Sequence, residues 1–503
     1  MTTPVRDLFG IDTRSLAVFR IALAAAIVAD LLIRSADLAA LHTGEGVLPR
    51  ALLDEQVRAR APALVPVLAL VPHVLLDGAA GQALLFALAG AVAVLLAAGW
   101  RTRWMTVASW VLLMSLQARN PAVRNGGDEI FRLLLFWSMF LPLGASWSLD
   151  ARRAGRPGPP RLLTGGAPAA LLLQVALIYP FNALYKDGAA WTTDFTALEL
   201  FLGNATWSAA AGTALLAWPG LLQVMTAAIL GLEWCGWMLA FSPVRHGAAR
   251  TLAVVLFAGF HAGILVLSQI DFFAVVGIVA WTVFLPPWFW TRVAAVGRRG
   301  PPPEEAPARQ PVPRLEGAAA LAILGYVVFL NVTGYTGLFG RPAPSVLQAP
   351  ALVLQIDQQW NMFSPEPARR SRFLAARGET AGGGTVDLLV DAQPLGAGTA
   401  MHPPSGRFAR DRWRAYFGYL HRQPAEARER LGGRLAAWLG AQWNAAHRGD
   451  ERLERVRLYR VDTPIALAGD PEPDRRRSRV RELATVTVSA PPQGASRVLP
   501  PRG

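Results

Sequence analysis

The sequence predicts an all-α polytopic membrane bundle followed by a smaller α+β extramembrane domain, and two observations predict this fold class. The chain has 503 residues, of which 53% are hydrophobic and 17% are charged, which is apolar for a soluble protein. The apolar residues gather into blocks of about 17–25 residues, the length that crosses a bilayer core of roughly 30 Å. Nearly all blocks precede residue 340, so we expect a transmembrane domain over residues 1–340 and a soluble domain over residues 341–503.

The apolar blocks predict about nine transmembrane helices. They cover residues 15–33, 79–100, 104–116, 130–144, 167–184, 221–241, 250–267, 272–289 and 315–332. The broken apolar stretch after the first block contains Pro62, Pro66 and Pro72, and it suits short interfacial or re-entrant helices better than a full span. Residues 298–314 form a Pro-rich linker that cannot be helical throughout.

Basic loops predict the orientation of these helices, because short cytoplasmic loops are enriched in Lys and Arg. The loops after the second, fourth, sixth and eighth blocks are basic, and alternate loops of a bundle lie on one side of the membrane. They contain Arg101, Arg103, Arg152, Arg153, Arg156, Arg161, Arg245, Arg250, Arg292, Arg298 and Arg299. We therefore expect a multi-pass protein of the cell (inner) membrane, with a cytoplasmic N-terminus and a periplasmic or extracellular C-terminal domain.

The net charge of +14 does not by itself indicate nucleic acid as a partner. The arginines lie between apolar blocks and along the C-terminal tail, where orientation signals and solvated surface are found. We expect the lipid bilayer, and no nucleic acid, as the partner. The seven histidines are scattered without the four-residue helical spacing of a zinc pair, so no metal site is predicted.

Residues 341–503 mix signals for strands and helices. Residues 386–390 and 483–488 are short runs with β-branched side chains, which indicate strands. Residues 407–443 place apolar side chains such as Trp413 and Phe417 at helical spacing. The C-terminal domain is therefore predicted to be α+β.

One count singles out a candidate catalytic residue. Of the 49 Lys and Arg residues, only Lys186 is a lysine. Arginine serves equally well on a solvated surface, but it is effectively always charged, whereas a partly desolvated lysine can act as a general base. Lys186 directly follows the fifth predicted helix, at the mouth of an apolar bundle. We predict a catalytic base, with a lysine that snorkels to the membrane interface as the alternative.

Among the ionisable residues of the predicted helices, where exposure to lipid is expensive, we expect four to face the bundle interior as a buried polar network. A structural role in locking helices together is the expected one for Arg20 and Asp30. Structural and functional roles both stay open for Glu233 and His261.

Several motifs, taken in order, resemble one family. They are DTRSLAVFR from residue 12, HTGEGVLPR from residue 42, RNPAVRNGGDEIFRLLLFWSMFLPLGASWSLD from residue 119, and QQWNMFSPEP from residue 358. The element Tyr185-Lys186-x-x-x-x-Trp191, Glu233 and the pair Phe260-His261 match as well. With these motifs, residues 10–370 resemble the HTTM (horizontally transferred transmembrane) domain of the bacterial relatives of the vitamin K-dependent gamma-carboxylase.

The resemblance implies a chemistry. Gamma-carboxylases oxidise a reduced naphthoquinone with oxygen to make a strong base, which removes a glutamate γ-proton before carbon dioxide adds. By resemblance, Lys186 deprotonates reduced vitamin K or menaquinol, O2 and CO2 are co-substrates, and an exported peptide is the partner. The residues implied at the quinone pocket are Asn125, Trp191, Trp360 and Met362. One position departs from the family, because the animal enzymes carry a catalytic histidine after the asparagine and Gly126 stands here.

Two classes of function follow. The first is a quinol-dependent, carboxylase-like enzyme that acts on an exported peptide, and the retained lysine favours it. The second is a non-enzymatic membrane protein that binds a quinone or lipid, or acts as a partner or immunity protein, and the missing histidine favours it. A transporter is disfavoured because the spans lack paired Gly/Pro breaks.

Overall fold

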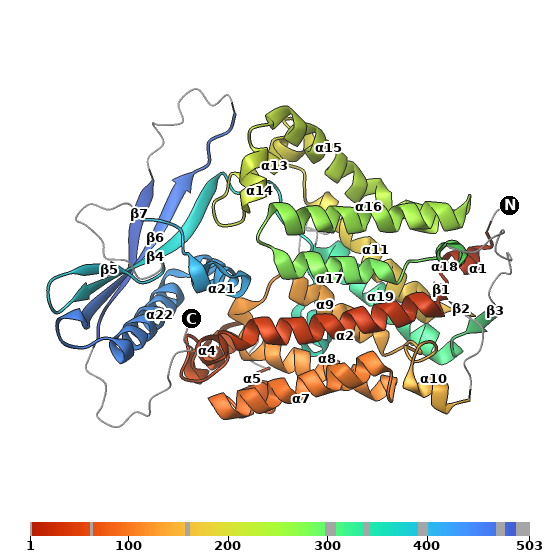
Figure 1. Ribbon diagram of the computed structural model, residues 1–503, viewed down its shortest axis with the longest axis horizontal. Coiled ribbons are helices and arrows are strands. Elements are labelled where there is room, and N and C mark those ends of the chain that lie inside the picture. Colours follow the sequence, from red (N-terminus) through yellow and green to blue (C-terminus); the bar gives the residue numbers. More distant parts are fainter. Residues whose placement is uncertain are drawn as a thin grey trace.

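A computed structural model describes the chain over residues 3–60, 64–155, 161–296, 308–334, 343–390, 401–468 and 478–488. Figure 1 shows a bundle of roughly parallel helices with a sheet-containing region at one end. The N-terminus lies at the opposite end of the bundle. This arrangement confirms a mostly helical membrane domain followed by a C-terminal region that contains a sheet.

Six helices in the described residues are long and apolar enough to cross a membrane, which confirms a multi-pass membrane protein. A seventh span results if two helices that meet at a 90° bend, α17 (Asp271–Thr282) and α18 (Pro287–Ala295), are counted as one. The break falls at Pro286 and Pro287, since proline cannot continue the hydrogen-bond ladder of a helix. The six helices are α2 (Thr13–Ser35), α7 (Ala79–Ala98), α11 (Gly166–Leu184), α15 with its 3-10 extension (Pro219–Phe241), α16 (His246–Leu267) and α19 (Arg314–Gly334).

The third and fourth predicted spans are helices that do not meet this criterion. They are α8 (Thr102–Arg119) and α9 (Gly126–Ser138). α8 contains Arg103, Gln117 and Arg119, which lower its mean hydropathy. α9 has only 13 residues, and nearly all of them are buried, as in a short core helix. By length and composition, six or seven candidate spans therefore stand where the sequence predicted about nine.

The stretch between the first two spans forms short helices, as its prolines predicted. They are α3 (Leu38–Leu41), α4 (Arg50–Arg60), α5 (Val65–Leu68) and α6 (Pro72–Leu75). Their apolar side chains share a core with the C-terminal region, in which Leu41, Val47 and Leu53 belong to the same buried cluster as Trp413 and Leu435. The core beside the C-terminal sheet is therefore built from two separate segments of the chain.

The C-terminal region contains an antiparallel sheet in the order β5-β4-β6-β7. Its strands are β4 (Arg370–Thr380), β5 (Thr385–Asp387), β6 (Leu453–Pro464) and β7 (Arg479–Thr487). Helix α22 (Ala425–Ala446) packs against β6 and β7, and α21 (Asp411–Arg422) lies between the sheet and the bundle. The two predicted strands fall on β5 and β7 and the predicted helical stretch on α21 and α22, whereas the longest strands, β4 and β6, were not predicted.

A small sheet lies at the other end of the bundle, where β1 (Ile11–Asp12) pairs with β2 (Arg161–Thr164) and β2 pairs with β3 (Ala308–Pro311). Residues 298–307 of the predicted Pro-rich linker lie outside the described residues, and the remainder forms β3 and the start of α19. The remaining short helices are α1 (Val5–Leu8), α10 (Leu149–Arg153), α12 (Ala189–Thr192), α13 (Ala197–Leu202), α14 (Ala210–Leu215) and α20 (Ser345–Leu354), with 3-10 turns at Pro121–Val123, Gly236–Phe241, Gly406–Ala409 and Gly449–Glu451.

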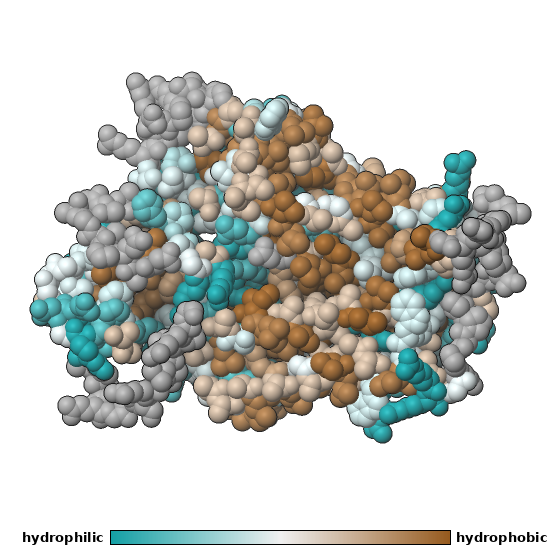
Figure 2. Space-filling view, viewed as in Figure 1, coloured by the Kyte–Doolittle hydropathy of each residue, from teal (hydrophilic) through white to brown (hydrophobic). Residues whose placement is uncertain are grey.

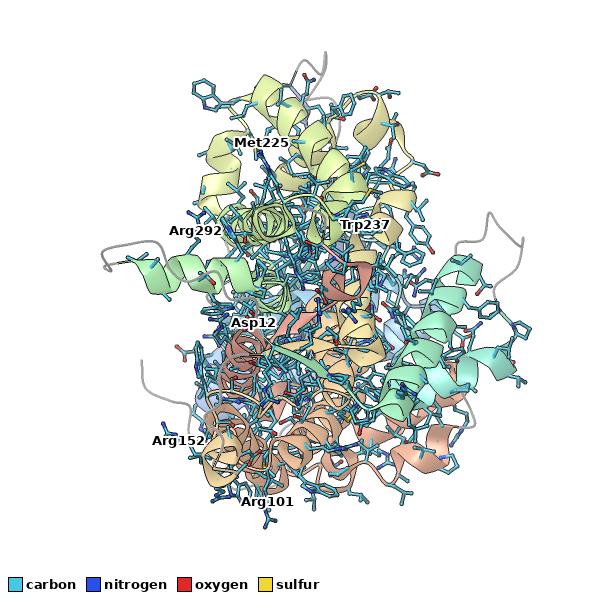
Figure 3. The ribbon with its side chains drawn as sticks, turned by 90° about the vertical axis from the view of Figure 1, so that its right-hand side faces the viewer. Asp12, Arg101, Arg152, Met225, Trp237 and Arg292 are labelled. Atoms are coloured by element: carbon cyan, nitrogen blue, oxygen red, sulfur yellow. The ribbon has the colours of Figure 1, made fainter. Side chains whose placement is uncertain are left out.

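The face in Figure 2 is apolar over the bundle, and hydrophilic side chains gather where the bundle meets the C-terminal region. Figure 3 views the end of the bundle that lies away from that region, and Arg101, Arg152 and Arg292 are labelled there. Arg250 behaves differently from these loop arginines. It is buried, and its guanidinium donates to the carbonyl of Gly10 at 3.0 Å. The labelled loop arginines thus gather at one end, whereas Arg250 has a packing role; Arg156, Arg298 and Arg299 lie outside the described residues.

Candidate functional site

An internal cavity of about 400 Å³ lies where the bundle meets α21. Its walls come from α9, α11, α13, α15, α16 and α17, together with the segment after α20. Most of the lining is apolar, and it includes Ile178, Phe201, Phe260, Phe273 and Met362. A cavity with apolar walls and a few convergent polar groups is the usual setting of a small-molecule site. The polar groups of α11, α15 and α16 occur here in two clusters.

The first cluster is an ion pair between Lys186 and Glu233. The Lys186 Nζ atom lies 2.6 and 2.8 Å from the two carboxylate oxygens, and the two side chains are 4% and 2% exposed. Asn182 donates to the same carboxylate at 2.9 Å and accepts from the Met362 N–H at 3.0 Å. Lys186 directly follows the end of α11, so the helix places Asn182 one turn before it on the same face. The pair is therefore held by three elements of the fold.

Two opposing effects act on the pKa of Lys186. Burial lowers the pKa, and the Glu233 carboxylate raises it. Burial is the larger effect, so the pKa lies below the ordinary value of 10.5. A neutral amine is thus easier to reach here than on a solvated lysine, which is the property a general base requires.

Three of the four residues implied at a quinone pocket line this cavity, namely Asn125, Trp191 and Met362. The Lys186 Nζ atom lies 4.1 Å from the Trp191 ring centroid, and the Trp191 indole N–H donates to the Phe363 carbonyl at 2.9 Å. Trp360 is not among the lining residues. It is buried, and its indole N–H donates to Gln358 at 2.6 Å. Trp360 therefore supports the segment that carries Met362.

The loop before α9 gives Asn125 a structural role as well. Its side chain caps α9 by accepting from the Asp128 N–H at 3.2 Å, and it donates to Asp411 of α21. A Cβ atom at Gly126 would lie 3.3 Å from the Met362 sulfur and 3.5 Å from the Phe273 ring. A histidine side chain at position 126 would therefore extend into occupied space, and glycine leaves this wall of the cavity open.

The second polar cluster contains Tyr179, His261 and Trp281. The Tyr179 hydroxyl lies 2.9 Å from His261 Nε2 and accepts from the Trp281 indole N–H at 2.6 Å. All three side chains are buried, and Tyr179 and His261 line the cavity. A Cβ atom at Gly277 of α17 would lie within 2.2–2.5 Å of the His261 ring atoms. Glycine at this position therefore lets α17 pack directly on the imidazole.

The other two predicted network residues are buried at separate places. Asp30 belongs to a closed ring with Arg34, Asp128 and Arg412, whose two carboxylates each contact both guanidiniums. The Arg34 contacts measure 2.8 Å to Asp30 and 2.6 Å to Asp128, and Arg412 lies 2.6 Å from Asp30. Arg412 comes from α21, so the ring joins α2 and α9 to the C-terminal region.

Arg20 lies toward the opposite end of α2 and binds the backbone. Its guanidinium donates to the carbonyls of Ala97, Leu143, Ser146 and Trp147 at 2.6–3.2 Å. The four residues predicted as a buried network are thus all buried, and they occupy four separate settings: Arg20 on carbonyls, Asp30 in the charged ring, Glu233 with Lys186, and His261 with Tyr179.

The fold and the cavity define a class of protein: a multi-pass membrane protein with a buried lysine–carboxylate pair at an internal apolar cavity. A comparison of the chain with known protein families, with curated proteins and with solved structures finds no match in any of the three.

Sequence reasoning missed several residues of the site. Tyr179 and Asn182 stand seven and four residues before Lys186, a helical spacing that places all three on one face and that the sequence displays. Trp281, Asp411 and Arg412 carried no such signal, because only the tertiary fold brings them to the bundle.

Proposed function

We propose that this protein is a membrane enzyme of the HTTM and gamma-carboxylase type, which binds a reduced naphthoquinone such as menaquinol and removes its hydroxyl proton through Lys186. The observation that carries the proposal is the burial of the only lysine against an apolar cavity, in contact with Glu233, Asn182 and Trp191. The resemblance in residues 10–370 supports the same assignment.

The residues present fit such a ligand. A cavity of about 400 Å³ accommodates a fused two-ring aromatic system, and its walls are aromatic and aliphatic. Trp191 and Met362 would hold the ring beside Lys186, and Asn125 would bound the side facing α21. A bound reduced naphthoquinone supplies the protons and two electrons, and dioxygen is the proposed electron acceptor.

Side chains of the protein itself can accept the hydroxyl proton and stabilise the resulting charge. The neutral Lys186 amine accepts the hydroxyl proton and becomes an ammonium, which the Glu233 carboxylate stabilises at hydrogen-bond distance. Asn182 holds that carboxylate in place, and the apolar walls exclude water that would compete for the proton. Carboxylation of a peptide would require a further acid–base group, and Gly126 offers none, so the proposal is confined to quinol deprotonation and oxidation.

Replacing Lys186 tests this proposal. Lys186→Arg keeps the charge but cannot accept a proton near neutral pH, so we expect it to lose about 10²–10⁴-fold in menaquinol oxidation, as Lys186→Ala does. The measurement is oxygen-dependent menaquinol turnover by the purified full-length protein. Arg292→Lys, at an exposed position, is the matched control and should keep wild-type turnover. An arginine variant within a few-fold of wild type would discard the base assignment.

A non-enzymatic quinone- or lipid-binding protein is the second candidate, and Gly126 favours it. The same experiment separates the two candidates. Saturable menaquinol binding without turnover by the wild-type protein supports a binding protein, whereas turnover that depends on Lys186 supports the enzyme.

We propose that the helices run with the N-terminus in the cytoplasm and the C-terminal region in the periplasm or outside the cell. Arg101 precedes α8 and Arg152 follows α9, and both lie at the end of the bundle away from the C-terminal region (Figure 3). On this proposal α8 and α9 also cross the membrane, which would give nine passages. The gathered arginines mark that end as cytoplasmic.

A further inference from the structure

The cluster of Tyr179, His261 and Trp281 lines the cavity, and deprotonation by Lys186 does not use it. Its hydrogen bonds fix where the imidazole proton sits. An indole N–H can only donate, so Trp281 donates to the Tyr179 oxygen. Among the described residues His261 Nε2 is the one acceptor within reach of the Tyr179 hydroxyl, so that hydroxyl donates to Nε2. In the neutral ring the proton then lies on Nδ1.

His261 Nδ1 has no hydrogen-bond partner among the described residues, although the side chain is only 1% exposed. A buried polar donor that is left unpaired costs roughly 1–3 kcal/mol. Such a group in the wall of a cavity is satisfied when a ligand acceptor reaches it. The network on the other ring nitrogen thus leaves Nδ1 as the unpaired polar atom of a side chain that lines the cavity.

The two polar clusters lie along the same helix face. Tyr179 precedes Asn182 by three residues and Lys186 by seven, so roughly 5–10 Å separates the clusters along the axis of α11. The walls between them are apolar, with Ile178 and Phe273 among the lining. An aromatic ring with oxygen atoms on opposite edges spans such a gap with a hydrogen bond at each end.

We propose that His261 is a ligand-binding residue that donates from Nδ1 to the ligand oxygen remote from Lys186, and that the cavity therefore selects aromatic compounds with oxygens on two opposite edges. Tyr179 and Trp281 are positioning residues that hold the imidazole in the donating form. The proposal rests on the proposed function, because the first oxygen is the one that meets Lys186. An acceptor oxygen is present in both the quinol and the quinone, so His261 binds both redox forms.

A series of two-ring probes with two, one or no ring oxygens tests the proposal by equilibrium binding to the purified full-length protein. The probes are menadione with two ring oxygens, 2-methyl-1-naphthol with one, and 2-methylnaphthalene with none. We expect the wild-type protein to bind menadione about 3–10-fold more tightly than the naphthol, the value of one net hydrogen bond. In His261→Leu this preference should vanish, while 2-methylnaphthalene still binds as it does to wild type.

The outcomes separate the two proposals. If wild type binds none of the probes, the proposed function fails and this inference with it. If wild type prefers menadione and His261→Leu keeps the full preference, a quinone site stands and the role of His261 is overturned. If His261→Leu also fails to bind 2-methylnaphthalene, the cavity of this variant has collapsed. The binding preference of Tyr179→Phe then tests the role of His261. A reduced preference in Tyr179→Phe supports the proposal, and an unchanged one overturns it.

Discussion

The Lys186–Glu233 pair shows how a single residue must be tested in a buried setting. Removing one partner of a buried ion pair leaves an uncompensated charge and typically costs 3–5 kcal/mol. Glu233→Ala therefore reports mainly on folding, because Lys186 would stay buried without its carboxylate. Lys186→Arg keeps the charge opposite Glu233, so its effect reports on proton transfer.

His421 in α21 predicts a loss of stability in acid. Burial, together with Arg372 and Arg460 and against the opposing effect of Asp462, lowers the pKa of His421 from 6.5 to about 3. The unfolded chain therefore binds a proton that the folded chain does not, so stability is full above pH 6.5 and falls as the pH drops toward 3. At pH 5 the loss is about 2 kcal/mol relative to neutral pH. His421→Leu should remove this part of the pH dependence in denaturant unfolding at pH 5 and 7.

The control is His402→Leu, at an exposed position, which should leave the pH dependence of wild type unchanged. Equal pH profiles for wild type and His421→Leu would contradict the burial of a neutral imidazole.

The residues of the candidate site could be predicted from the sequence only where a residue count or a local motif points to them. Lys186 stands out by its count, and Asn125, Trp191 and Met362 by a motif. The cavity walls also need α21, some 225 residues after Lys186, and no local pattern encodes that approach. Trp360 was expected to line the pocket. Instead, it is buried outside the pocket lining and donates a hydrogen bond to Gln358.

At the scale of elements, α16 and α17 depend on a close contact at His261. A Cβ atom at Gly277 would overlap the imidazole at 2.2 Å, whereas Gly259, on an exposed side of α16, has no atom within 4 Å. Gly277→Ala should therefore lower stability by about 1–3 kcal/mol and weaken menadione binding. Gly259→Ala is the matched control and should be neutral, or stabilising by up to about 1 kcal/mol. Thermal unfolding in one detergent checks both, and equal melting temperatures would contradict the contact.

Helices were the most predictable elements because apolar periodicity and length are local properties. All nine predicted spans contain helix. However, α17 and α18 meet at a 90° bend where the sequence suggested one straight span. The Pro286-Pro287 pair was visible, but its effect depends on which helices pack around the break. β4 and β6 were missed because a sequence such as RSRFLAARGET lacks clear polar–apolar alternation, and its partner strand lies some 80 residues away.

At the scale of the whole molecule, the proposed orientation in the membrane rests on the arginines gathered at one end of the bundle and on the buried core at the other end. Reporter fusions after Gly155 and after Gln423 should report opposite sides of the membrane, with the first in the cytoplasm. A fusion after Asp77 should agree with Gln423, because residues 40–74 share a buried core with α21 and α22. Agreement between the Gly155 and Gln423 fusions would overturn the proposed orientation.

The boundary predicted at residue 340 does not separate two packing units, because residues from both sides of it share one buried core. The core beside the C-terminal sheet takes Leu41, Leu53 and Val74 from the N-terminal segment and Trp413 and Leu435 from the C-terminal segment. Removal of residues 341–503 would expose these apolar side chains. The segment before α7 therefore needs the C-terminal region for its own burial.

The ring of Asp30, Arg34, Asp128 and Arg412 sets an order for biogenesis. During synthesis, Asp30 and Arg34 are made first and Asp128 about 90 residues later. Until Arg412 is made, two carboxylates therefore share one guanidinium. The fourth member arrives only when Arg412 has been synthesised and its region has reached the end of the bundle where α21 docks. The helices inserted first thus carry an unmatched negative charge through most of synthesis.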